Sequence, residues 1–315
     1  MQREDFYFDS RDGETRIHAV KWVPDQKPVC ILQIVHGMAE YIARYERLAL
    51  FLAKEGILVT GEDHLGHGLS VTDKNGEKNH PLGYFCSNDP ATVVVRDVHR
   101  LKKIVQEQYP GVPYVILGHS MGSFMLRNYL CRYGSGIDGA IIMDSGMMPA
   151  GMLKFACGLA KFLGAVQGEK HESMLLNAIA FGSYNKKIKN PSTRMDWLSR
   201  DEKEIQKYIE DPLCGFTFTV NGFATLFELM RRMHCREDLQ KMPKDLPVLF
   251  LAGDGDPVGS YGESVRGVAG DFKKLGMQHV ACKIYPEMRH ETLNEQGREE
   301  VEEDVLSWVK KIAAV

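Results

Sequence analysis

YVILGHSMG, at residues 114–122, is an apolar run followed by a serine between two glycines. Residues 114–117 have the length and β-branched content of a buried strand, and helical periodicity continues from Ser120 as far as Tyr133. A serine at such a strand-to-helix junction lies on a sharp turn, which requires flanking residues without side-chain bulk. The pattern predicts that Ser120 is an exposed nucleophile rather than a simple helix N-cap.

Outward from this turn, apolar runs of strand length alternate with helical patterns. The predicted strands are residues 6–8, 17–23, 30–35, 57–60, 114–117, 140–143, 248–252 and 281–285. The first two flank Asp12-Gly13 and indicate an opening hairpin. The predicted helices are residues 45–54, 92–108, 120–133 and 294–314. This alternation indicates an α/β fold whose central sheet is mostly parallel and flanked by helices.

The alternation stops between Asp144 and Val248, where about a hundred residues carry helical patterns rich in Met and Phe but no convincing strand. A structureless loop of that length is unusual in a compact domain, and prolines divide the segment into helix-sized pieces. We therefore expect residues 1–146 and 241–315 to form the α/β core, with residues 147–240 inserted as a helical cap.

The composition is that of an ordinary globular protein, with 44% hydrophobic residues in a chain of 315. A net charge of -3 without a run of Lys or Arg argues against a nucleic-acid partner. Seven scattered cysteines without a Cys-x-x-Cys pair are typical of a reducing compartment. Residues 1–9 do not resemble a signal peptide, and the longest apolar stretch, residues 147–166, contains two lysines. We expect a cytoplasmic protein.

A serine hydroxyl is a poor nucleophile, so acyl transfer requires a base, a group that orients the base, and donors for the oxyanion. His290 lies in the loop after the last predicted strand, in the chain order Ser, Asp, His. Asp256 follows the strand at 248–252, where the next residue is a proline that fixes the backbone. Asp254 is the alternative acid, although it is also typical of a turn, and Asp144 is more typical of a loop hydrogen-bonder.

Two backbone amides are candidates for the oxyanion hole. In HGMAE, residues 36–40, the glycine allows a turn that points the Met38 amide toward a bound carbonyl oxygen, and the Met121 amide is its partner. A second cluster, DHLGHGLS at residues 63–70, invites interpretation as a metal site. No second cluster of ligands completes such a site, so buried hydrogen bonding of His64 and His67 is favoured. We expect neither a metal nor a cofactor.

Four stretches resemble the monoacylglycerol lipase and lysophospholipase branch of the α/β-hydrolases, also described with the serine aminopeptidase-like hydrolases. They are HGMAE followed by Arg44-Tyr45, DHLGHG with Ser70, GHSMG, and DGDP with His290. The resemblance implies the α/β-hydrolase fold, with Ser120 attacking an ester carbonyl.

The same resemblance implies roles for the other site residues. His290 accepts and returns the proton, Asp256 orients His290, and the Met38 and Met121 amides hold the oxyanion. The substrate is implied to be a small acyl ester such as a monoacylglycerol or lysophospholipid, hydrolysed through an acyl-enzyme. The particular ester stays open, because fold does not determine substrate.

Other functions of the same fold are a peptidase, a thioesterase, or a binding protein without catalysis. Every triad position holds a competent residue, which favours an enzyme. Apolar side chains of the cap either line an acyl pocket or pack the cap on the core: Met147, Met148, Met152, Leu153, Phe155, Leu159, Phe162 and Leu163. Lys154 and Lys161 allow transient contact with an anionic lipid surface, although a solvated helix face is the more ordinary interpretation. Nothing in the sequence indicates the oligomeric state.

Overall fold

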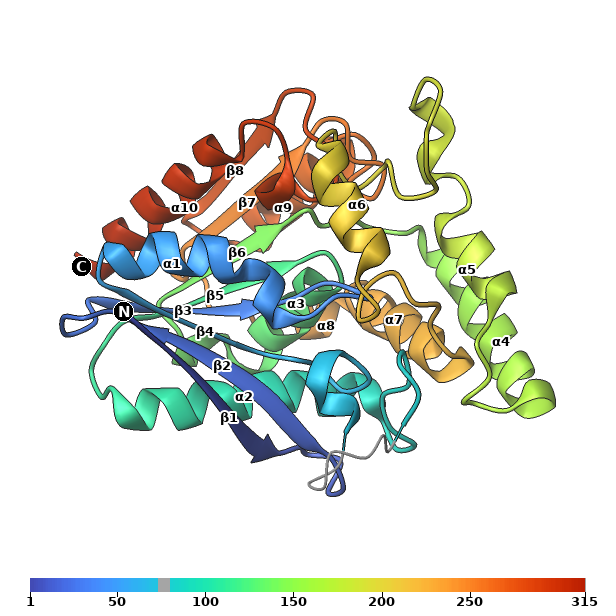
Figure 1. Ribbon diagram of the computed structural model, residues 1–315, viewed down its shortest axis with the longest axis horizontal. Coiled ribbons are helices and arrows are strands. Elements are labelled where there is room, and N and C mark those ends of the chain that lie inside the picture. Colours follow the sequence, from blue (N-terminus) through green and yellow to red (C-terminus); the bar gives the residue numbers. More distant parts are fainter. Residues whose placement is uncertain (73–79, 315) are drawn as a thin grey trace.

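A computed structural model describes residues 1–72 and 80–314, built around a sheet of eight strands (Figure 1). The strands are β1 (Gln2–Asp9), β2 (Arg16–Val23), β3 (Cys30–Val35), β4 (Ile57–Glu62), β5 (Tyr114–His119), β6 (Gly139–Met143), β7 (Val248–Gly253) and β8 (Val280–Tyr285). Their order across the sheet is β1-β2-β4-β3-β5-β6-β7-β8. β2 is antiparallel to β1 and β4, and the other pairs are parallel, so the predicted mostly parallel sheet is confirmed.

Helices cover both faces of the sheet. α1 (Glu46–Lys54) and α10 (Arg298–Ala313) pack on one face, and α2 (Pro90–Gln108), α3 (Met121–Tyr133) and α9 (Glu263–Lys274) pack on the other (Figure 1). Successive strand residues point to opposite faces, so Ile116 belongs to the core under α2 and α3, whereas Leu117 belongs to the core under α1 and α10. Burial on both faces explains why the central strands read as continuous apolar runs.

Two of the element boundaries that differ from the prediction have local reasons. β4 continues to Glu62 rather than ending at Thr60, because its last residues still pair with β2. The final helix begins at Arg298 rather than at residue 294. Thr292–Asn294 form a 3₁₀ turn, and Gly297, with a φ of 83°, immediately precedes the helix.

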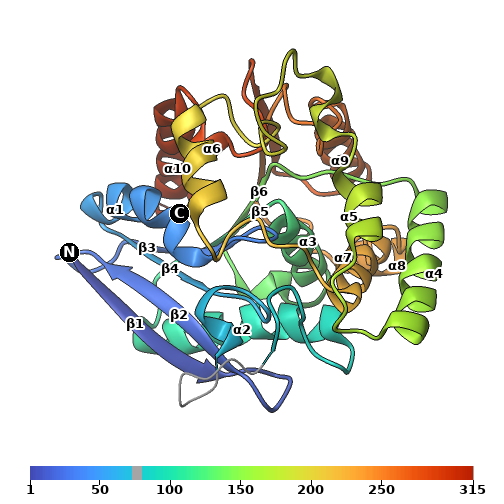
Figure 2. The ribbon, with the colours of Figure 1, turned by 45° about the vertical axis from the view of Figure 1, so that its right-hand side comes forward.

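Between β6 and β7 the chain leaves the sheet and forms five helices. These are α4 (Ala150–Gln167), α5 (Met174–Phe181), α6 (Glu202–Glu210), α7 (Val220–Arg232) and α8 (Arg236–Leu239). Residues 144–247, all of them described, contain one isolated β-bridge, between Glu172 and Thr219, and no strand. α4 packs on α7, and α4 and α5 form the side of the molecule farthest from α1 and α10 (Figures 1 and 2). The division into core and cap at residues 147 and 240 stays a prediction.

None of the helices of residues 1–72 and 80–314 combines the length and the apolar character needed to cross a bilayer.

Candidate active site

Ser120 lies at the turn between β5 and α3, with backbone angles φ of 51° and ψ of -118°. A positive φ is unfavourable for a residue with a Cβ atom, so the surrounding structure must hold the turn in place. A Cβ atom on Gly118 would lie 2.5 Å from the Gly122 carbonyl oxygen, and one on Gly122 would lie 1.9 Å from the Val35 carbonyl oxygen. Both glycines are therefore required for the sharp turn that presents Ser120.

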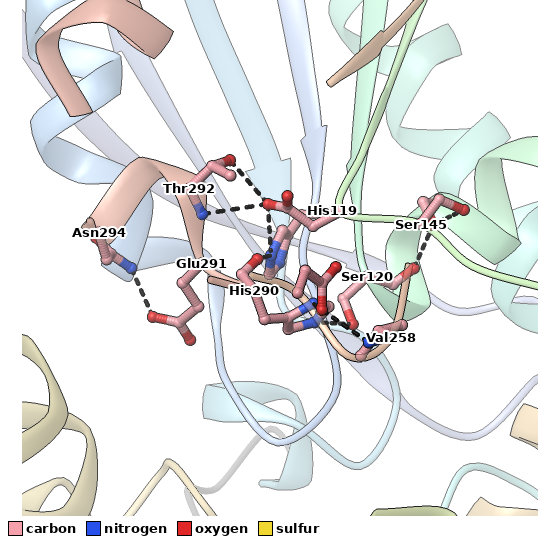
Figure 3. Close-up of polar contacts among 12 residues, drawn as sticks. His119, Ser120, Ser145, Val258, His290, Glu291, Thr292 and Asn294 are labelled. Atoms are coloured by element: carbon pink, nitrogen blue, oxygen red, sulfur yellow. Dashed lines mark hydrogen bonds and ion pairs between the residues drawn. The ribbon is translucent and has the colours of Figure 1, made fainter. Parts of the chain in front are cut away.

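Ser120 and His290, predicted to act together with Asp256, meet at this turn (Figure 3). His290 Nε2 lies 2.8 Å from Ser120 Oγ, and His290 Nδ1 lies 3.0 Å from Asp256 Oδ1. β7 and β8 are parallel neighbours, so the loops that follow them, with Asp256 and His290, leave the same edge of the sheet. Asp256 is fully buried and accepts hydrogen bonds from the Val258 and Gly259 amides at 2.8 and 3.3 Å. In this arrangement an imidazole can take a proton from a serine.

The two alternative carboxylates have other partners. Asp254 is exposed, and its Oδ1 accepts a hydrogen bond from the Glu287 amide at 2.6 Å. Asp144 Oδ2 accepts hydrogen bonds from the hydroxyl and the amide of Thr292, at 2.8 and 3.3 Å. Of the three candidate acids, the structure thus brings Asp256 within hydrogen-bonding distance of the His290 ring.

Met38 and Met121, whose amides were predicted to bind an oxyanion, both border the cavity at Ser120. The Gly37 amide donates to Glu40 Oε1 at 2.6 Å, and a Cβ atom at position 37 would collide with that oxygen. Within the described residues, neither the Met38 nor the Met121 amide donates a hydrogen bond to the protein. Free amides beside a nucleophile are suited to bind a developing negative charge.

A buried charge network, not predicted from the sequence, lies beneath Ser120. His119 Nδ1 is 3.2 Å from Glu40 Oε1, and His119 Nε2 is 3.5 Å from Asp144 Oδ2. Burial alone would lower the pKa of His119, but the interactions with Asp144 and Glu40 outweigh burial and raise this pKa well above its ordinary value. This environment favours the charged form of the His119 ring.

Arg44 extends this network to the loop that carries His290. Its guanidinium donates to Glu40 Oε2 at 2.6 Å and to the two carboxylate oxygens of Glu291 at 2.9 and 2.8 Å. Burial would raise the pKa of Glu40, but Arg44 and His119 hold that pKa well below its usual range. The network joins the loop of Met38, the nucleophile turn and the loop of the base. Its sequence signal is weak, because only the i, i+4 spacing of Glu40 and Arg44 is local.

The histidines first considered as metal ligands form a buried cluster behind the loop of Met38. The rings of His36 and His64 stack with centroids 3.9 Å apart, and the Ala39 amide donates to His67 Nε2 at 3.3 Å. Burial lowers the pKa of His64 to about 4 and that of His67 to about 3, so both rings are neutral at pH 7. In the described ranges, no three His, Cys, Asp or Glu side chains are arranged to hold a metal. These rings hydrogen-bond within the core, the interpretation favoured from the sequence.

A cavity of about 790 Å³ lies against Ser120, bordered by the helices that follow β6. Its volume falls within the range of small-molecule sites. Its apolar wall includes Phe124, Met147, Met148, Met152, Ile179, Phe181, Leu226, Phe227 and Met230. Flexible thioethers and aromatic rings of this kind can surround an acyl chain.

The cap side chains whose role was left open divide into three groups. Met147, Met148 and Met152 line the cavity. Leu153 and Leu163 are buried in the core, and Leu159 is partly buried against it. Phe155 and Phe162 do neither, because they are 64% and 61% exposed. Each interpretation therefore holds for part of the segment and neither for all of it, since helical periodicity does not distinguish a cavity wall from core packing or from an exposed surface.

A model of the family described as serine aminopeptidase, S33, matches residues 26–297. The chain belongs to this family. A monoacylglycerol lipase of Mycolicibacterium smegmatis is 29% identical to this S33 chain over 94% of both proteins. A human monoglyceride lipase is 27% identical over 87% of the chain and 83% of the relative.

Solved structures give the same placement for this S33 chain. A thermostable carboxyl esterase from Bacillus coagulans has a TM-score of 0.90 and 32% identity, covering 99% of both chains. A soluble variant of the Saccharomyces cerevisiae monoglyceride lipase has the same fold, with a TM-score of 0.74 at 19% identity over 99% of this chain and 95% of the other. The chain lies in the monoacylglycerol lipase-like branch of the α/β-hydrolases.

Proposed function

We propose that this S33 protein is a serine hydrolase of carboxylic esters, with Ser120, His290 and Asp256 as its catalytic triad. The hydrogen bond of 2.8 Å between Ser120 Oγ and His290 Nε2 carries the proposal, together with the buried Asp256 on the other ring nitrogen. Relatives described as monoacylglycerol lipase and carboxyl esterase support an ester as the substrate.

In the proposed reaction, Ser120 Oγ attacks the ester carbonyl while its proton passes to His290 Nε2. Asp256 holds the Nδ1 proton and stabilises the imidazolium that forms. The amides of Met38 and Met121 bind the oxyanion of the tetrahedral intermediate. The alcohol then leaves with the proton from His290, and the acyl group stays on Ser120. Water, activated by the same histidine, releases the acid and restores the serine.

The proposed substrates are medium-chain or long-chain acyl esters such as monoacylglycerols or lysophospholipids. The apolar wall and the volume of the cavity support this choice. Each methylene group that moves from water into such a wall contributes about 0.8 kcal/mol. The acyl chain should therefore increase kcat/KM as it lengthens within the cavity.

Two measurements test the proposal. S120A is expected to abolish both labelling by a fluorophosphonate probe and hydrolysis of a p-nitrophenyl ester series from acetate to laurate, because an alanine side chain has no nucleophilic oxygen. Wild-type kcat/KM should rise along the series. Persistent labelling at another serine would overturn the assignment of Ser120, and a steady fall from acetate to laurate would overturn the acyl-chain preference.

An aminopeptidase with the same triad is less well supported by the charges in the cavity. Such an enzyme needs a free carboxylate to bind the substrate ammonium group. Among the described residues that line the cavity, the carboxylates are Glu40 and Glu291, and both bind Arg44. This pairing favours an ester without an amine requirement.

We also propose that residues 147–240 form a cap whose outer side makes transient contact with a lipid surface. Exposed apolar side chains of α4 and α5 that do not line the cavity include Phe155, Phe162, Val166 and Leu175. Lys154 and Lys161 are exposed on the same helix α4. Apolar side chains beside basic ones are typical of helices at a lipid interface. The seven cysteines, all free, support a cytoplasmic location.

A further inference from the structure

Arg194 is the single lysine or arginine among the described residues that line the cavity. It lies between α5 and α6 and makes no ion pair with any residue in the ranges 1–72 and 80–314. The nearest acid in the sequence is Asp196, whose carboxylate accepts hydrogen bonds from the Ser192 and Thr193 amides at 2.7 and 3.0 Å. Asp196 therefore stabilises its own loop and leaves the guanidinium without a carboxylate partner.

More positive charge precedes Arg194 in the same segment. Residues 184–194 contain Lys186, Lys187 and Lys189 and no acidic residue, although the whole chain has a net charge of -3. All three lysines are exposed, and Lys187 Nζ lies 3.4 Å from the ring centroid of Tyr261. A local excess of cations beside a cavity attracts anionic ligands and disfavours cationic ones.

Hydrogen bonds hold the end of this segment against the loop of the catalytic base. The His290 and Glu291 amides donate to the carbonyl oxygens of Trp197 and Leu198 at 3.3 and 2.7 Å. The ring centroids of Trp197 and His290 are 5.0 Å apart. Arg194 precedes Trp197 by three residues, so their Cα atoms lie within about 11 Å of each other. A short segment therefore connects Arg194, which lines the cavity, to residues that pack against His290.

In acyl transfer, the part of the cavity beside the catalytic histidine holds the leaving alcohol of the ester. The histidine gives its proton to the departing alcohol, so the alcohol part of an ester must lie beside His290. The acyl chain then occupies the apolar wall formed by α4, α5 and α7. A charge near His290 acts on the leaving alcohol rather than on the acyl chain.

We propose that Arg194 binds an anionic group, a phosphate or a carboxylate, on the alcohol part of the ester. The enzyme then prefers acyl esters with an anionic head group to neutral esters of the same chain length. This inference rests on the proposed ester hydrolysis and narrows its substrate class. The three lysines of the segment raise the local anion concentration, and Arg194 makes the directed contact.

The experiment compares octanoylglycerol with octanoylglycerol phosphate, both kept monomeric so that no lipid surface is present. Wild-type kcat/KM is expected to be about tenfold higher for the phosphate, since a hydrogen bond to a charged group is the stronger kind. R194Q should reduce the ratio of the two kcat/KM values about tenfold, and R194K should restore part of it. Added salt should lower the wild-type ratio through screening. K54Q removes an exposed cation of α1 that does not line the cavity, and it should keep the ratio.

The outcomes separate this inference from the proposed function. Equal kcat/KM values for the two esters, or a ratio that R194Q leaves unchanged, would overturn anion recognition while ester hydrolysis stands. A loss in K54Q as large as that in R194Q would also overturn it, because the effect would then be general. Failure of the wild type to hydrolyse either ester, or any acyl ester tried beside them, would overturn the proposed function itself. The octanoyl ester of glyceric acid shows whether a carboxylate is recognised as well as a phosphate, and either result supports an anionic head group.

Discussion

Asp256 and Asp254 lie in the same loop but in opposite surroundings, which provides a matched test of the triad. Asp256 is buried against His290 Nδ1, whereas Asp254 is exposed and binds the Glu287 amide. D256N is expected to lower kcat by roughly 10³- to 10⁴-fold, because an amide cannot hold the histidine in the required tautomer. D254N should change kcat by about twofold or less. Steady-state hydrolysis of p-nitrophenyl butyrate measures both, and equal losses would contradict the assignment of Asp256.

A second prediction at the residue scale concerns the contribution of His119 to the stability of the fold rather than to catalysis. Its folded pKa lies above the unfolded value of about 6.5, because Asp144 and Glu40 outweigh burial. The contribution of charged His119 to the free energy of unfolding is therefore fully present below the unfolded pKa and is lost as the pH rises through the folded pKa. H119Q should lower the free energy of unfolding by about 3 kcal/mol at pH 6 and flatten its decline at higher pH.

Urea unfolding at a series of pH values measures this effect of H119Q. The control is H234Q, since His234 is an exposed histidine whose ring contacts the Met148 carbonyl rather than a carboxylate. A wild-type curve that H119Q shifts downward without any change of slope would contradict a protonated His119.

Single residues of the site differ in how far the sequence could predict them. Ser120 and His290 were predictable because chain order and loop position suffice to select them. The choice of Asp256 over Asp254 depended on side-chain direction, which the loop geometry determines. The contact between Arg44 and Glu291 joins positions 247 residues apart, and no local pattern carries it.

At the scale of elements, the turn between β5 and α3 depends on two backbones in close contact. A Cβ atom at Gly122 would lie 1.9 Å from the Val35 carbonyl oxygen, whereas one at Gly158 in α4 would meet no atom within 4 Å. G122A is expected to destabilise the protein by about 1–3 kcal/mol and to displace Ser120. G158A should stabilise it by about 0.4–1 kcal/mol, because alanine has less backbone freedom in the unfolded chain.

Thermal unfolding and kcat together test this pair of glycine substitutions. G122A should reduce both Tm and kcat, while G158A should raise Tm without lowering kcat. A fully active and stable G122A protein would show that the contact with Val35 does not constrain the turn.

No helix was predicted over α9, although it packs on the sheet. The strands and the other core helices, α1, α2, α3 and α10, were predictable because each buries a continuous or one-sided apolar surface with a recognisable period. α4 was not, since its apolar residues face three environments: the cavity, the core and the outside. Met152, Leu153 and Phe155 are close neighbours in the sequence but belong to these different environments. Periodicity records how apolar a face is and not what covers it.

For the molecule as a whole, the exposed side of α4 and α5 leads us to expect that the protein binds its substrate at a lipid surface. The double variant F155S/F162S is expected to lower hydrolysis of an ester embedded in anionic vesicles by about tenfold or more, because two aromatic side chains no longer enter the lipid interface. Hydrolysis of soluble p-nitrophenyl butyrate should stay within about twofold of wild type.

The matched control for this variant is I209S, which removes an apolar side chain that is 46% exposed on α6. I209S should leave vesicle hydrolysis unchanged. Equal losses on the vesicle ester and the soluble ester in F155S/F162S would contradict a role in lipid contact.

The hydrogen bonds between residues 196–199 and the loop of His290 have a mechanical consequence. Arg289 donates to the carbonyl oxygens of Asp196 and Ser199, and the next two amides bind Trp197 and Leu198. A cap that swung open as one rigid body would break all of these bonds and pull the base away from Ser120. An opening that kept these bonds would be confined to the part that contains α4 and α5, with residues 196–199 as its stationary border. Substrate could then enter and product could leave while His290 and Ser120 stayed within hydrogen-bonding distance.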